Sequence, residues 1–120
     1  MPKSIIVIDD EEVVCKMTKM ILEKEGYEVE TYTDSTQALA RIKEKRFDLV
    51  ITDLKMEEVD GMEILRTVNK LYPDTELIMI TAYATLDTAL EALRERVFDF
   101  FPKPIKIEEL KESVKKALGT

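Results

Sequence analysis

Short runs of apolar, mostly β-branched residues alternate along this chain with longer amphipathic stretches, and this alternation constrains the fold more than any other feature. Each apolar run has the length of a strand, and each stretch between them is long enough for a helix. The expected strands cover residues 5–8, 28–32, 48–52, 76–81 and 97–101. The expected helices cover residues 11–25, 34–46 and 61–71, and two more lie around residues 86–93 and 107–117.

The apolar residues of the expected helices have helical spacing, which predicts the faces that pack on a sheet. The first helix is expected to turn Val14, Met17 and Ile21 inward. The fourth helix gathers its apolar residues on one face, at Leu86, Ala89, Leu90 and Leu93.

Four of the five expected strands are almost continuously apolar, and only residues 28–32 alternate like a strand nearer an edge. Strands that are buried on both faces are typical of a parallel sheet with helices on each side. The sequence therefore predicts one α/β domain over residues 1–120, a doubly wound five-stranded parallel sheet flanked by five helices, with strand order 2-1-3-4-5.

Composition excludes several classes of function. A net charge of −7 argues against direct binding of nucleic acid, because the chain would repel phosphate. No histidine is present, so histidine-based catalytic triads and metal sites are excluded, and the lone Cys15 cannot form an internal disulfide. The apolar run at residues 5–8 is too short for a secretion signal or a membrane span, so we expect a cytoplasmic protein without a membrane partner.

Polar residues suited to chemistry stand where the expected strands end. Asp9 and Asp10 follow the first strand, Asp53 follows the third, Thr81 ends the fourth, and Lys103 comes just after the fifth. In doubly wound sheets the functional crevice lies beyond the carboxyl ends of the strands, where the strand order reverses. With the order 2-1-3-4-5, the three carboxylates converge there.

Three carboxylates in one crevice repel one another unless a cation or protons intervene. Oxygen ligands without histidine or cysteine favour Mg²⁺. A carboxylate beside a divalent cation, the ammonium of Lys103 and the hydroxyl of Thr81 is suited to accept a phosphoryl group.

These residues resemble the motifs of a response regulator receiver domain of two-component signalling, over essentially the whole chain. The motifs that carry the resemblance lie at residues 7–11, 53–56, 60–61, 81–82 and 99–104. The resemblance implies a flavodoxin-like fold, with Asp53 as the phosphoacceptor. It also implies a Mg²⁺ site in which Asp10 ligates directly and Asp9 largely through water, with Asp53 and the backbone carbonyl of Lys55 as further ligands.

The resemblance further assigns the residues that respond to the phosphoryl group. Thr81 and Lys103 would contact it, and the bond between Lys103 and Pro104 would be cis. Phe100 occupies the position of the switch aromatic, whereas Phe98 and Phe101 read as core residues.

A receiver of this kind catalyses its own phosphorylation and a slow autodephosphorylation, and it is not a metabolic enzyme. Lys55 and Tyr83 flank the site, so we expect them to tune the lifetime of the phosphoryl group by shielding it from water.

The implied partners are a sensor histidine kinase or phosphotransfer protein as donor, and an output domain or partner protein. The output would use the face made by the fourth helix, the fifth strand and the fifth helix, and phosphorylation-linked homodimers fit the same face. The alternative is a phosphorylation-independent interaction module on the same fold. A phosphatase with an aspartyl nucleophile is disfavoured, because the chain is too short for a substrate-binding cap domain.

Some positions depart from the family pattern. Glu57 stands where a proline usually follows the methionine, so we expect the loop at residues 53–60 to be more mobile, with Glu57 and Glu58 adding negative charge. Arg96 and Val97 replace the usual small residues before the last strand, and Lys106 provides a weaker cap for the last helix.

Overall fold

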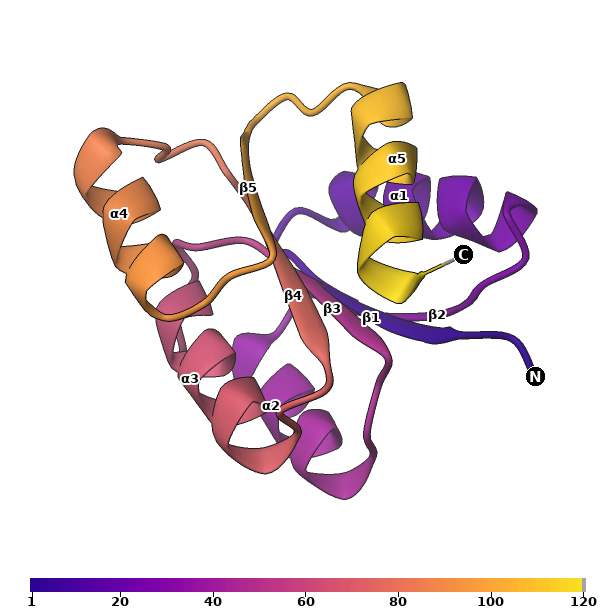
Figure 1. The fold of residues 1–120 in the computed structure, drawn as a ribbon, viewed down its shortest axis with the longest axis horizontal. Coiled ribbons are helices and arrows are strands. Elements are labelled where there is room, and N and C mark those ends of the chain that lie inside the picture. Colours follow the sequence, from indigo (N-terminus) through magenta and orange to yellow (C-terminus); the bar gives the residue numbers. More distant parts are fainter. Residues whose placement is uncertain (120) are drawn as a thin grey trace.

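Five parallel strands form one sheet in the order β2-β1-β3-β4-β5, which confirms the predicted fold (Figure 1). The computed structural model describes residues 1–119. The strands are β1 (Ser4–Ile8), β2 (Glu28–Tyr32), β3 (Leu49–Thr52), β4 (Glu76–Thr81) and β5 (Asp99–Pro102). The helices are α1 (Glu12–Lys24), α2 (Ser35–Glu44), α3 (Gly61–Leu71), α4 (Leu86–Arg94) and α5 (Ile107–Leu118). Within residues 1–119, no helix is both long and apolar enough to cross a lipid bilayer.

Helices cover both faces of the sheet, with α1 and α5 on one side and α2, α3 and α4 on the other (Figure 1). Successive residues of a strand point to opposite faces, so the central strands supply both cores. In β1, for example, Ile5 and Val7 pack toward α1 and α5, whereas Ile6 and Ile8 pack toward the other three helices.

The inward face of α1 differs from the prediction by about one residue. Cys15, Thr18 and Leu22 are the buried residues of this helix, and Met17 is about half exposed. Apolar residues occur on two faces of α1, so their spacing alone does not identify the face that meets the sheet.

The predicted apolar face of α4 exists, but much of it is exposed to solvent. Leu86, Leu90 and Leu93 are exposed, and the buried residue of the helix is Ala92. The helix therefore presents an apolar surface that the rest of the described chain does not cover.

The last strand starts two residues later than predicted and lies at an edge of the sheet. Arg96 adopts a left-handed backbone conformation with φ of 64°, and the amide of Val97 bonds to the carbonyl of Ala92 at the end of α4. Because the chain is still closing the helix at Val97, the strand begins at Asp99. Phe98 and Phe101 pack toward α1 and α5, as expected of core residues.

Candidate functional site

The residues expected to carry the chemistry are fixed through their own backbones at the carboxyl edge of the sheet. The amide of Asp9 donates to the carbonyl of Tyr32 at 3.1 Å, and the amide of Asp53 donates to the carbonyl of Ile8 at 2.9 Å. The amide of Lys103 donates to the carbonyl of Thr81 at 2.9 Å. These bonds continue the strand pairing by one residue, so the sheet sets the starting points of the side chains.

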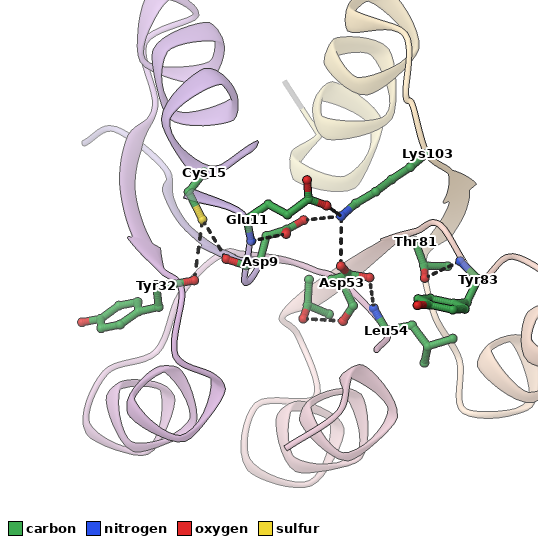
Figure 2. A network of polar contacts seen from close by, with 10 residues as sticks. Asp9, Glu11, Cys15, Tyr32, Asp53, Leu54, Thr81, Tyr83 and Lys103 are labelled. Carbon is green, nitrogen blue, oxygen red and sulfur yellow. Dashed lines mark hydrogen bonds and ion pairs between the residues drawn. The ribbon is translucent and has the colours of Figure 1, made fainter. Parts of the chain in front are cut away.

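The ammonium of Lys103 joins carboxylates from two neighbouring strands (Figure 2). Its Nζ lies 2.9 Å from Oδ2 of Asp9 and 2.9 Å from Oδ2 of Asp53. It also lies 3.1 Å from Oε1 of Glu11. The other carboxylate oxygens are held by the backbone, since Oδ1 of Asp9 accepts from the amide of Glu11 and Oδ1 of Asp53 from the amide of Leu54.

Apart from the exposed Glu11, the side chains that Lys103 joins are largely shielded from water. The side chains of Asp9, Asp53 and Lys103 are 4%, 7% and 15% exposed. Burial raises the pKa of the Asp9 carboxyl, and the bonds from Glu11 and Lys103 offset this only in part. Burial alone would lower the pKa of the Lys103 ammonium, but its bonds to Asp9 and Asp53 raise that pKa above its ordinary value. One ammonium is shared among three carboxylates, so the negative charge of the site exceeds its positive charge.

The donor set fits a divalent cation. Carboxylate oxygens of Asp9, Asp10 and Asp53 all lie within 4.8 Å of one another. Asp10 is exposed and lines a cleft of about 450 Å³ together with Ser35, Glu57 and Glu58. Hard oxygen donors, an open side and excess negative charge are the conditions that Mg²⁺ favours.

The side chains of the remaining predicted residues form no hydrogen bond with the side chains of this cluster, although the carbonyl of Thr81 accepts from the amide of Lys103. Thr81 is fully buried, and its hydroxyl accepts from the amide of Tyr83 at 3.0 Å (Figure 2). The side chains of Tyr83 and Lys55 are exposed, and Phe100 is half-buried against the core beneath α2, α3 and α4. The peptide bond between Lys103 and Pro104 is cis.

Two residues of the site were given no role by the sequence analysis. Glu11 is a third partner of Lys103, and neither the acidic run after the first strand nor the motif at residues 7–11 predicted this ion pair. The amide of Gly61 donates to the carbonyl of Leu54 at 2.8 Å. A Cβ atom on residue 61 would lie 2.9 Å from Cα of Leu54. A side chain at this position would therefore displace the backbone that carries Asp53.

The family model and the most similar curated proteins indicate the same family for this chain. The profile of the "Response regulator receiver domain" matches residues 5–115. "Transcriptional regulatory protein ZraR" of Klebsiella oxytoca is 36% identical over 115 residues, which cover 96% of this chain and 26% of the relative. The chain thus spans about a quarter of the length of the curated relatives that it matches first.

Solved structures agree with that family. A response regulator receiver domain protein (CheY-like) from Methanospirillum hungatei JF-1 has a TM-score of 0.95 and 34% identity, covering 99% of this chain and 95% of that one. The beryllofluoride-activated NtrC4 receiver domain dimer has a TM-score of 0.91 and 31% identity, covering 97% and 96% of the two chains.

Replacing Lys103 with methionine tests how far the cluster depends on its ammonium. Lys103→Met leaves Asp9 and Asp53 buried without a counter-charge, so we expect the free energy of unfolding to fall by about 3 kcal/mol. The exposed Lys106 nearby serves as control, and Lys106→Met should change it by less than about 0.5 kcal/mol. Urea unfolding in a buffer with a chelator measures both; equal losses in the two variants would contradict the assigned role.

Proposed function

This chain belongs to the response regulator receiver domain family, and from that membership we propose that it is a switch phosphorylated on Asp53 with Mg²⁺ bound beside it. The observation that carries the proposal is the single ammonium of Lys103, placed 2.9 Å from both Asp9 and Asp53. A buried carboxylate that is already paired with a cation can accept a phosphoryl group whose negative charge that cation then neutralises.

Phosphoryl transfer needs a nucleophilic oxygen and neutralisation of the transferred charge. An oxygen of Asp53 forms the new O–P bond as the bond from phosphorus to the donor's histidine nitrogen breaks. The amide of Leu54 holds Oδ1 of Asp53 at 2.7 Å, which fixes the orientation of the carboxylate during attack. Lys103 transfers its contact from the carboxylate to a phosphoryl oxygen.

The neighbouring carboxylates would form the metal site. Asp10 would bind Mg²⁺ directly and Asp9 largely through water, and Asp53 and the backbone carbonyl of Lys55 would be the other ligands from the protein. When bound, the cation neutralises charge on the phosphoryl oxygens and on the carboxylates. The excess of carboxylates over ammonium groups at this edge supports the assignment.

A chain of hydrogen bonds connects the phosphorylation site with α4. The hydroxyl of Thr81 accepts from the amide of Tyr83, and the carbonyl of Tyr83 accepts from the hydroxyl of Thr88 at 3.2 Å. Thr88 and Thr85 cap the start of α4. If Thr81 turns to bond the phosphoryl group, it leaves Tyr83 and disturbs this cap, while Phe100 turns further inward.

The exposed apolar face of α4 is the surface through which a partner can detect that change. Leu86, Leu90 and Leu93 form the part of the output face, shared with β5 and α5, that an output domain, a partner protein or a second copy would cover. The donor is a sensor histidine kinase or phosphotransfer protein, and the receiver works beside it in the cytoplasm. The domain catalyses its own phosphorylation and slow dephosphorylation and turns over no separate metabolite.

Mass spectrometry of the intact protein tests the proposal. After incubation with acetyl phosphate and Mg²⁺, the chain should gain the mass of one phosphoryl group, because Asp53 is the paired and oriented nucleophile. Asp53→Asn should gain none, and removing Mg²⁺ should suppress the gain in the wild type. No gain in the wild type with any small phosphodonor would instead favour a phosphorylation-independent interaction module.

The lifetime of the phosphoryl group tests the two flanking side chains. Both Lys55 and Tyr83 are exposed beside the site, so Lys55→Ala and Tyr83→Ala should alter access of water and change the decay rate severalfold. Lys70→Ala, which removes an exposed lysine near the end of α3, should leave the rate unchanged. Decay is followed by intact mass after removal of the donor; unchanged rates in both variants would refute the role.

A further inference from the structure

The loop between Asp53 and α3 contains a strained turn. The amide of Val59 donates to the carbonyl of Glu57 at 2.8 Å, which closes a turn of three residues. The central residue, Glu58, has φ of 69°, a left-handed conformation that is uncommon outside glycine. A three-residue turn with positive φ at its centre is rare and strained, so something outside the turn must favour it.

The hydroxyl of Ser35 holds the two groups that close this turn. It donates to the carbonyl of Glu57 at 2.6 Å and accepts from the amide of Val59 at 3.1 Å. Ser35 is the first residue of α2 and is only 3% exposed. The partners are 22 and 24 residues away in sequence, so these bonds attach the loop to a separate helix.

Ser35 is not needed to cap its own helix. The carboxylate of Asp34 caps α2 by accepting from the amides of Thr36 and Gln37 at 2.9 and 3.1 Å. That cap also fixes where α2 begins, and so where the Ser35 hydroxyl lies. The loop at residues 57–59 is thus held by the capped first turn of α2.

The held turn borders the proposed metal site. Ser35 and Glu57 line the same cleft as Asp10. Lys55, whose carbonyl is the proposed backbone ligand, lies between Asp53 and this turn. Glu57 has no proline ring to restrict the loop, and the two bonds of Ser35 supply a restraint from outside.

We propose that Ser35 is a positioning residue, which holds the turn at residues 57–59 so that the loop presents its backbone and carboxylates correctly for Mg²⁺. This inference rests on the proposed function, because it gives Ser35 a role at that same site. It acts through the loop and does not touch the phosphoryl group.

The Mg²⁺ dissociation constant, measured by calorimetric titration with MgCl₂, tests this role. Ser35→Ala should raise the constant about tenfold, the order seen when groups that support metal ligands are removed. Thr75→Val is the matched control, since the buried Thr75 hydroxyl also donates to a backbone carbonyl at 2.6 Å, that of Phe47, beside the start of β4. A rise of less than about threefold over this control would overturn the proposal.

A second variant separates positioning from general loss of packing. Glycine adopts positive φ readily, so adding Glu58→Gly to Ser35→Ala relieves the strain that the hydroxyl opposes. Because Glu58→Gly also removes a carboxylate from the cleft, the double variant is compared with Glu58→Gly alone. Ser35→Ala should raise the Mg²⁺ dissociation constant much less in the Glu58→Gly background than in the wild type; an equal rise in both backgrounds would show that Ser35 does not act through the turn.

Hydrogen exchange and phosphorylation of the wild-type protein are two further measurements that test the role of Ser35 and the proposed function separately. If Ser35→Ala does not fold, hydrogen exchange of the wild type decides, because a held turn protects the amide of Val59 and an unprotected amide there contradicts the proposal. Phosphorylation of the wild type is measured in parallel. Its failure would refute the proposed function, whereas the role of Ser35 is judged by the Mg²⁺ constants.

Discussion

The ion cluster in which Lys103 joins Asp9 and Asp53 is the interaction on which the rest of the site depends. Two carboxylates at 4% and 7% exposure repel each other, and the ammonium between them offsets that repulsion. The sheet supplies the geometry, because the last carbonyls of β2, β1 and β4 accept from the amides of Asp9, Asp53 and Lys103. A single ammonium leaves the edge short of positive charge, so the edge favours a divalent cation, and the added positive charge would then neutralise a phosphoryl group.

Different parts of the fold support the two sides of the cluster. On one side, Thr81 is linked through Tyr83 and Thr88 to the start of α4, whose apolar face is exposed. On the other side, Ser35 at the start of α2 holds the loop that follows Asp53. The first connection is suited to change on phosphorylation, and the second is suited to stay fixed.

Much of this arrangement follows from sequence for one physical reason. The carboxyl ends of parallel strands share an edge, so residues after each apolar run must gather there once the strand order is correct. The pattern of apolar and polar residues does not predict the features that depend on the direction of a side chain or on contacts between residues far apart in the sequence. Spacing could not choose between the two apolar faces of α1, and nothing local to Ser35 indicates that its partners lie at residues 57 and 59.

The role of the Lys103 cluster is tested by a crystal structure with Mg²⁺ and beryllofluoride, a tetrahedral substitute for a phosphoryl group, in which the position of Lys103 is determined. We expect beryllofluoride on an oxygen of Asp53, with Nζ of Lys103 moved onto a fluorine and Mg²⁺ beside Asp10. An empty Asp53 at saturating beryllofluoride, or beryllofluoride on Asp53 with Lys103 still paired to that carboxylate, would contradict that role.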